Sequence, residues 1–332
     1  MGRRNFVRAA VALGAMVLVP AAMAAGGFSA GSDGLGDPMF PLAGNGGYDV
    51  SNYSLTLDYT PAGNRLTGTA VITARATQNL SQFDLDFRMV NSITRLLVNG
   101  TPASFSYAKE QELVVSPAAG LVQGKTFTVT VDYSGQPLVV TDPDTSIEGW
   151  VPTDDGAFVV NEPQGSPAWY PVNDNPRDKA TYDFRVTVPD GLTVMANGVL
   201  VSQTHAGGKA TWFWRESDPM APYLATTTLG KFDLTMSTTD GIPTYVAVDP
   251  QLAKGQVLTK LPDAVRFYVS IYGPYPFNAV GAIVDSAKVV GYSLETQTKP
   301  NFPYVPDEAT LVHELAHMWF GDSLTLQTWP DI

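Results

Sequence analysis

Residues 53–59, YSLTLDY, determine the fold class expected for this chain. Tyrosine and leucine occupy every second position, and serine, threonine and aspartate stand between them. A period of two is typical of a β-strand with one buried and one solvated face. The turn signals Asn99-Gly100 and Ser134-Gly135 separate further stretches of this kind, which predicts an all-β domain. These stretches are 66–74, 83–87, 96–98, 126–133, 157–160, 182–188, 210–214 and 223–229.

The pattern changes near residue 240, where the first helical periodicity follows. Residues 254–272 place apolar side chains at helical spacing, and Pro262 within them predicts a kink or a break. Residues 244–248, 280–284 and 289–294 are expected to be strands. We therefore expect an α+β multidomain chain, with an all-β domain over residues 48–240 and the opening of an α+β domain over residues 241–332.

The composition limits the classes of partner. The chain has 332 residues, 32 acidic against 20 basic side chains, a net charge of −12 and no cysteine. Nucleic acid and anionic lipid are unexpected partners for so acidic a surface. Without cysteine there is no disulfide, thiolate metal site or cysteine nucleophile, so any metal would be bound by histidine and carboxylate.

The N-terminus has the features of an export signal. Residues 1–24 contain three arginines and no acid, followed by an apolar run and the small-x-small sequence Ala22-Met23-Ala24. Arg3-Arg4 resembles a twin-arginine signal of bacteria, and a general secretory signal is the alternative. We expect a secreted or extracytoplasmic protein with no membrane contact beyond this signal. Residues 25–47, rich in glycine and serine, are expected to be a flexible lead-in.

Residues 313–317, HELAH, are the strongest functional signal. A helix is predicted over residues 308–320, with Asp307 as its N-cap and Gly321 as its C-cap. Histidines four positions apart project from one face of a helix and can bind one metal ion, while Glu314 can accept a proton from water at that ion. The pattern predicts Zn²⁺ bound by His313 and His317. The alternative is a buried helix whose histidines have no metal.

A resemblance to a known family extends beyond this motif. Residues 312–332, VHELAHMWFGDSLTLQTWPDI, resemble the membrane-alanyl-aminopeptidase family of gluzincin zinc metallopeptidases, in which HELAHQWFG precedes a tryptophan-rich stretch. Weaker similarities lie at residues 48–55, 98–100 and 174–182. The resemblance implies a saddle-like N-terminal β-domain, the first part of a thermolysin-like catalytic domain, a Zn²⁺ cofactor, and peptide substrates with a free N-terminus.

The resemblance also implies roles for two more carboxylates. Glu295 falls where the family motif G-x-M-E-N places the glutamate that binds the substrate's α-amino group, although Leu294 and Thr296 replace Met and Asn. Glu162, in Asn161-Glu162-Pro163, matches a second acid of that amine site. Two carboxylates in a dry site bind an ammonium group well, and this contact restricts cleavage to the first residue.

The family's third zinc ligand is a glutamate that would fall four positions beyond Ile332, and its transition-state tyrosine lies further on. Asp322 and Asp331 are weak alternatives as ligands. We therefore expect a truncated aminopeptidase that lacks its C-terminal part, binds zinc weakly and has negligible activity as these 332 residues. A thermolysin-like endopeptidase and a secreted, non-catalytic β-rich binding module are the two alternative hypotheses.

Overall fold

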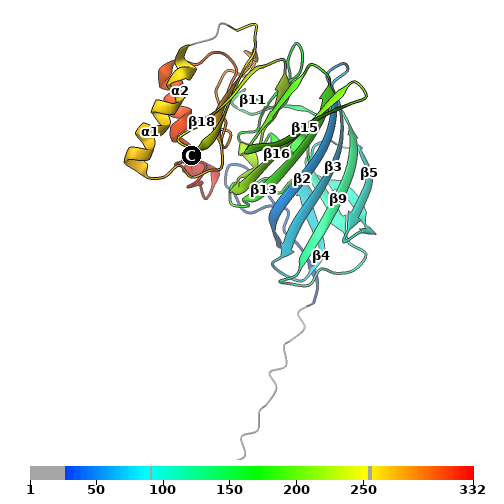
Figure 1. The fold of residues 1–332 in the computed structure, drawn as a ribbon. Coiled ribbons are helices and arrows are strands. Elements are labelled where there is room, and N and C mark those ends of the chain that lie inside the picture. The colour runs from blue at the N-terminus through cyan, green and yellow to red at the C-terminus, as the bar shows by residue number, and fades with distance from the viewer. Residues whose placement is uncertain (1–26, 90–91, 253–255) are drawn as a thin grey trace, which may run out of the picture.

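The computed structural model describes residues 27–89, 92–252 and 256–332. The predicted export signal, residues 1–24, lies outside these ranges. Within them, no helix is both long enough and apolar enough to span a bilayer. A curved β-domain forms the larger part of the molecule, and a smaller domain carrying both α-helices lies beside it (Figure 1).

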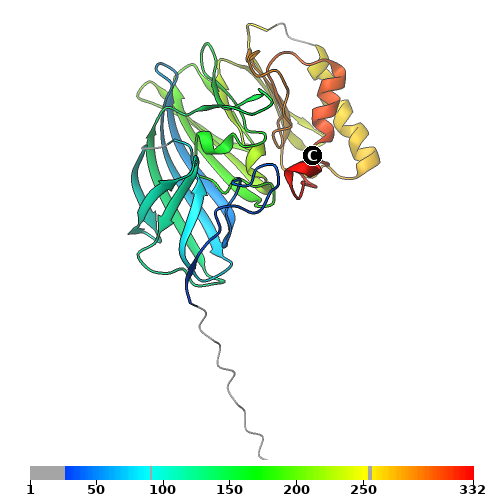
Figure 2. The same cartoon turned by 180° about the vertical axis from the view of Figure 1, so that it is seen from behind.

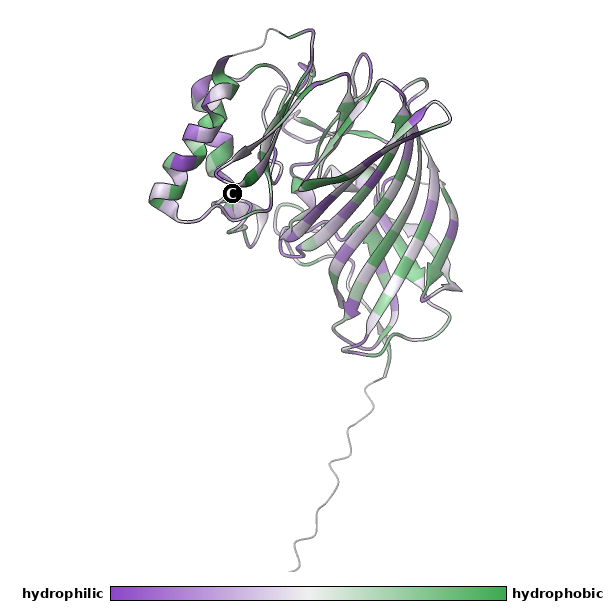
Figure 3. Ribbon diagram, viewed as in Figure 1, coloured by the Kyte–Doolittle hydropathy of each residue, from purple (hydrophilic) through white to green (hydrophobic). Residues whose placement is uncertain are grey.

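The largest sheet has eight strands and confirms the β-domain predicted from residues 53–59. Every neighbouring pair is antiparallel except β2 with β13. The alternation of apolar and polar residues along the strands is visible in Figure 3, and the four apolar residues of YSLTLDY are at most 1% exposed. The strand order is β15 (Val199–Ala206), β16 (Lys209–Met220), β13 (Ala180–Pro189), β2 (Tyr48–Thr60), β3 (Arg65–Ala76), β9 (Thr126–Gly135), β5 (Ile93–Val98) and β6 (Thr101–Pro102).

Two smaller sheets complete the β-domain, and a single hydrophobic core joins all three. Short 3₁₀ turns at Ser166–Ala168 and Pro222–Leu224 connect their strands. One sheet is β10 (Val139–Thr141), β11 (Ile147–Pro152), β12 (Ala157–Val160), β17 (Thr227–Gly230) and β14 (Thr193–Ala196). The other is β1 (Ser29–Ala30), β4 (Leu80–Asp86), β8 (Glu112–Ser116) and β7 (Ser104–Ala108).

The second domain has its own sheet and its own core. Helices α1 (Leu261–Tyr272) and α2 (Glu308–Ala316) pack on this sheet through a separate cluster of buried apolar side chains. Short 3₁₀ turns lie at Gln256–Lys260 and Trp329–Asp331. The sheet begins at Asp233, seven residues before the boundary predicted at residue 240. Its order is β18 (Asp233–Thr239), β19 (Ile242–Val248), β20 (Val280–Val284) and β21 (Asn301–Phe302).

One of the expected elements is confirmed and another is wrong. Residues 256–272 are divided into a 3₁₀ turn and α1, which is the break predicted at Pro262: the proline lies in the first turn of α1, where its missing N–H costs no hydrogen bond. Residues 289–294 form no strand, because Leu294 makes only an isolated bridge to Asn301. Two further expectations have shifted bounds. The strand expected at 223–229 begins at Thr227, after the Pro222 turn.

The helix expected to reach Phe320 ends at Ala316. Beyond it, the N–H groups of Met318 and Trp319 donate to carbonyls three positions back, so the chain tightens into turns. His317 is therefore the C-cap residue of α2.

The described part of the lead-in, residues 27–47, makes specific contacts with the rest of the chain at its buried positions. Asn45 is fully buried, and its N–H donates to Asn173 Oδ1 at 2.6 Å. Asp37 Oδ2 accepts from the N–H of Trp329 at 2.8 Å, which joins the lead-in to the last residues of the chain, as Figure 2 shows. A glycine-rich segment has much conformational freedom in the unfolded chain. Buried hydrogen bonds offset the conformational entropy that this segment loses on folding.

Candidate metal centre and the carboxylates around it

Helix α2 carries the HELAH motif and packs in the hydrophobic core of the second domain. The Asp307 side chain caps it, accepting from the N–H of Thr310 at 2.8 Å. Leu311 and Leu315 are fully buried on the face that contacts the sheet. Tyr268 of α1 donates to the carbonyl of Val312 at 2.9 Å, which fixes the helix against its neighbour. The motif therefore lies on a rigid element.

The two histidines have the geometry of metal ligands. His313 Nε2 and His317 Nε2 lie 3.1 Å apart. Two nitrogens bound at 2.0–2.1 Å to one tetrahedral Zn²⁺ would lie about 3.3 Å apart, close to this separation. His317 Nδ1 lies 2.9 Å from the carbonyl of Phe320 and must donate to it, because a carbonyl only accepts. The Nε2 of a neutral His317 then keeps its lone pair for a metal.

Glu314 and Glu295 lie close to this pair. Glu295, Glu314 and His317 each place one potential ligand atom within 4.8 Å of the other two. Both glutamates are 6% exposed. Burial, and secondly the charge of Glu295, raises the pKa of Glu314 to about 8. The structure thus brings together two residues that lie 19 positions apart in the sequence.

Glu162 reaches the same group of carboxylates from the β-domain. Burial raises its pKa to about 8, followed by the charges of Glu295 and Glu314. The loop that carries it is held by Asn161, whose Nδ2 donates to the carbonyl of Ala225 at 2.5 Å and whose Oδ1 accepts from the Trp169 indole at 3.0 Å. Three repelling carboxylates beside two imidazoles favour binding of cations at this place.

The segment that carries Glu295 is attached to the β-domain by buried hydrogen bonds. Asn197 Nδ2 donates to the Gln297 carbonyl at 2.7 Å, and the Gly198 N–H donates to Thr298 Oγ1 at 2.9 Å. Lys299, fully buried, donates to the carbonyls of Ala196 and Gly198. These contacts, between residues about 100 positions apart, fix Glu295 relative to the β-domain.

Asp322 and Asp331 do not join the ligand group. Asp331 Oδ2 accepts from the N–H and the hydroxyl of Thr328, so this carboxylate stabilises the last turn of the chain. Asp322 is fully buried and outside the cluster of mutually close ligand atoms, while Lys179 donates to its backbone carbonyl at 2.5 Å. Lys179 thereby ties the loop after α2 to the β-domain.

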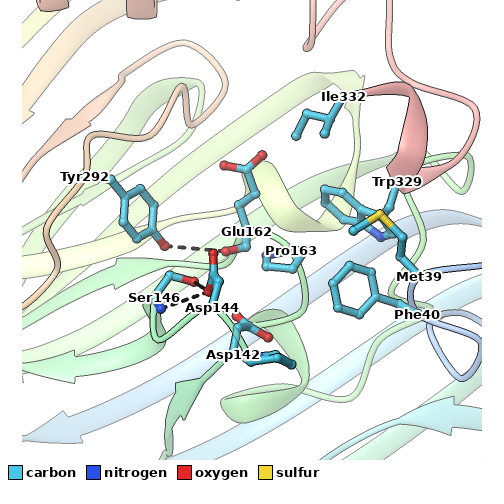
Figure 4. A pocket seen from close by; sticks show the side chains of 11 residues that line it. Met39, Phe40, Asp142, Asp144, Ser146, Glu162, Pro163, Tyr292, Trp329 and Ile332 are labelled. Carbon is cyan, nitrogen blue, oxygen red and sulfur yellow. Dashed lines mark hydrogen bonds between the residues drawn. The ribbon is translucent and has the colours of Figure 1, made fainter.

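A cavity of about 580 Å³ adjoins Glu162. Figure 4 shows Met39, Phe40 and Trp329 on one side, Tyr292 on the other, and the acidic side chains of Asp142, Asp144 and Glu162 between them. This volume is in the range of small-molecule sites. Residues of the lead-in, the β-domain and the second domain all line it, so it forms only in the folded two-domain chain.

The donor set fits a zinc ion. Two imidazoles, one oriented by the Phe320 carbonyl, and nearby carboxylates are nitrogen and oxygen ligands that Zn²⁺ accepts. Sequence reasoning singled out His313, His317, Glu314, Glu295 and Glu162, and the structure brings them to one site. It missed Lys299 and Asn197, since no local pattern marks a buried side chain that holds a distant loop. It also missed Asp142 and Asp144 of the cavity, which only the fold places near Glu162.

The fold and the site define a two-domain protein with the metal-binding helix of a metallopeptidase. Residues 50–224 match the family model described as the peptidase M1 N-terminal domain, and the chain belongs to the peptidase M1 family. The family resemblance seen in the sequence is thereby confirmed.

Curated relatives are aminopeptidases. Aminopeptidase M1-B of Oryza sativa subsp. japonica is 30% identical over 182 residues, 48% of this chain and 20% of that protein. Aminopeptidase M1 of Arabidopsis thaliana is 30% identical over 188 residues, 51% of this chain and 21% of that protein. The matched part thus spans about a fifth of the length of these relatives.

Solved structures agree over most of the chain. The M1 zinc metallopeptidase from Deinococcus radiodurans is 27% identical, with a TM-score of 0.82 over 90% of this chain and 70% of that one. A variant of it bound to a Tyr-Ser-Ala substrate aligns over the same shares, with a TM-score of 0.83 and 27% identity. The likeness covers both domains, which confirms the predicted fold class.

Proposed function

We propose that the protein is a zinc metallo-aminopeptidase that removes N-terminal residues from peptides. The observation that carries this proposal is the meeting of His313 and His317, with Nε2 atoms 3.1 Å apart, and the buried carboxylates of Glu314 and Glu295. The aminopeptidase relatives and the zinc metallopeptidase neighbours support it. The chemistry requires a metal, a base and an anchor for the substrate's amino group, and each has a candidate here.

Each side chain has a distinct role in this proposal. His313 and His317 hold Zn²⁺, which when bound would polarise the scissile carbonyl and make water more acidic. Glu314 accepts the proton of the attacking water and delivers it to the leaving amine. Glu295 and Glu162 bind the substrate's α-ammonium group in a water-poor site, which restricts cleavage to the first peptide bond.

The substitution Glu314→Gln tests the role of the base. In the zinc-loaded full-length protein, we expect kcat for a leucyl anilide to fall about 10²–10⁴-fold, because the amide cannot accept the proton. Zinc content, measured by atomic emission, should be unchanged, since the two histidines remain. Glu308→Gln is a matched control on the same helix, where the glutamate is exposed and pairs with Lys260. Equal activity of Glu314→Gln and the control would refute the assignment.

Export is a separate proposal that rests on residues 1–24 and their two arginines at positions 3 and 4. We expect the protein in the extracytoplasmic fraction of its bacterial host, with a new N-terminus near residue 25. Mass spectrometry of that fraction checks both points. Substituting Arg3 and Arg4 together with lysine should block export through a twin-arginine route and leave a general secretory route working.

A further inference from the structure

Helix α2 continues into a turn, residues 317–324, whose hydrogen bonds have a wider spacing than those of the helix. The N–H groups of Asp322, Ser323 and Leu324 each donate to the carbonyl five positions back, at 3.0, 3.3 and 3.0 Å. The first of these carbonyls belongs to His317, so the turn begins at a proposed zinc ligand. In the part of the chain that the structure describes, the carbonyls of residues 321–323 accept no backbone N–H, and such groups at a helix end need other donors.

Side chains of the β-domain donate to all three of these carbonyls. Lys179 Nζ, directly before β13, donates to the carbonyl of Asp322 at 2.5 Å and to that of Ser323 at 3.1 Å. The Tyr223 hydroxyl makes a longer contact of 3.5 Å with the carbonyl of Gly321. A cationic donor at the C-terminal end of a helix is favoured by the helix dipole as well as by the hydrogen bonds themselves. The β-domain therefore caps the turn that follows the metal-binding helix.

The same turn carries the group that orients His317. His317 Nδ1 donates to the carbonyl of Phe320 at 2.9 Å, and the three carbonyls held by the β-domain follow directly. The N–H of Asp322 donates back to the carbonyl of His317 at 3.0 Å. An imidazole whose Nδ1–H is held by a carbonyl keeps one tautomer and one ring orientation. A displacement of residues 320–322 would therefore displace the Nε2 atom that faces the metal.

Lys179 also brings a positive charge close to the acids of the site. Burial raises the pKa of Asp322 well above its usual value, the charge of Glu295 raises it further, and the charge of Lys179 lowers it. Because Lys179 Nζ donates to carbonyls, it offsets part of the repulsion among these acids while the oxygens of Glu295 and Glu314 remain available to cations.

We propose that Lys179 is a positioning residue of the zinc site: it holds the turn of residues 317–324 from the β-domain, keeps the Phe320 carbonyl in place, and thereby raises the affinity of His317 for Zn²⁺. The inference deepens the proposed function and rests on it for the identity of the metal. It makes the β-domain part of the metal centre, although both ligand histidines lie in or directly after α2 of the second domain.

The variant Lys179→Met tests this role, because methionine keeps an unbranched apolar stem and has no N–H donor. In the full-length protein, we expect zinc affinity, measured by competition with a chromophoric chelator, to fall about tenfold, the lower end of the range for groups that orient a metal ligand. Lys179→Arg keeps a cation with N–H donors and should restore most of the affinity. Lys209→Met is the matched control: Lys209 belongs to the same sheet, pairs with Asp58 at the surface, and its loss should leave zinc affinity unchanged.

The nitrogen chemical shifts of His317 in the metal-free protein test the positioning without zinc. The chain has three histidines, so the signals of this ring can be assigned by substitution. At alkaline pH, where imidazoles are neutral, we expect the Nδ1–H tautomer in the unmodified protein and in Lys209→Met, and a mixture of tautomers in Lys179→Met. If Lys179→Met does not fold, as judged by circular dichroism, Lys179→Gln takes its place with the same expectations, because its shorter, neutral side chain lacks the cation.

These measurements separate the inference from the proposed function, since neither needs turnover. A tenfold loss of zinc affinity that arginine reverses supports the inference even if no peptide is cleaved, in which case only the proposed function fails. Equal zinc affinity in Lys179→Met and Lys209→Met, or the same His317 tautomer in both, overturns the inference even if the protein is an active aminopeptidase.

Discussion

At the scale of single residues, the site is dominated by carboxylates that repel one another. Glu162, Glu295 and Glu314 come from three segments of the chain, and burial with mutual repulsion raises the pKa of Glu162 and Glu314 to about 8. Such an arrangement costs folding free energy unless cations neutralise it. A metal ion and a substrate ammonium group would do so, and this links the unfavourable charges to the proposed catalysis.

The substitution Glu295→Gln tests the proposed anchor for the ammonium group. In the zinc-loaded full-length protein, we expect kcat/KM for leucyl anilide to fall about 10–100-fold, because a charge-assisted hydrogen bond to the α-ammonium becomes a neutral one. Zinc content should not change. An endopeptidase has no use for this contact, so undiminished cleavage of leucyl anilide together with cleavage inside long peptides would contradict the role assigned to Glu295.

At the scale of elements, the end of α2 determines how His317 is oriented. The chain turns sharply at Gly321, where φ is +123°, a conformation that favours glycine. A Cβ atom at this position would lie 3.0 Å from His317 Nδ1, the atom that donates to the Phe320 carbonyl. Gly321 is not the C-cap that the sequence predicted, since His317 caps α2, but its lack of a side chain leaves room for the ligand imidazole.

The substitution Gly321→Ala should displace the His317 ring. We expect zinc affinity, measured by competition with a chelator, to fall about 10–100-fold, as it does when the group orienting a ligand histidine is disturbed. Gly207→Ala is the control, since Gly207 also has a positive φ of +60° in the β15–β16 turn but open space around it. Both variants carry backbone strain; equal zinc affinity in the two would show that the close contact is irrelevant.

At the scale of the whole molecule, the β-domain buries many acids far from the metal centre. Burial raises the pKa of Asp86 to about 7, although the N–H groups of Asp174 and Gly44 and the Gln111 amide donate to it. Burial also raises the pKa of Asp178 to about 7. In the unfolded chain both titrate near pH 4. Between these values the folded state binds more protons, so stability falls as pH rises.

Urea unfolding in the presence of a chelator should show this dependence. We expect the free energy of unfolding to decrease from pH 5 to pH 7, by about 1.4 kcal/mol per pH unit for each fully titrating acid. Asp86→Asn, which mimics the neutral acid, should reduce the slope, and Asp154→Asn at an exposed position should not. A free energy of unfolding that rises over this range would contradict the raised pKa of these acids.

The sequence predicted the features that depend on residues close together in the chain, and it did not predict those that depend on distant residues. The alternation in residues 53–59 predicted the β-domain because one face of each strand is buried. The spacing of His313 and His317 predicted their common direction, because helix geometry fixes it. The Asn45 contact of the lead-in and the Lys299 contacts depend on residues about 100 or more positions away, so no local pattern predicts them.

The most direct test of the account compares leucyl aminomethylcoumarin with its N-acetyl form. The zinc-loaded full-length protein should cleave the free amine and leave the acetylated compound intact, because Glu295 and Glu162 require an ammonium group. Removal of zinc with a chelator should abolish the cleavage, and added Zn²⁺ should restore it. Equal cleavage of both compounds, or cleavage that persists without metal, would contradict the assignment as a zinc aminopeptidase.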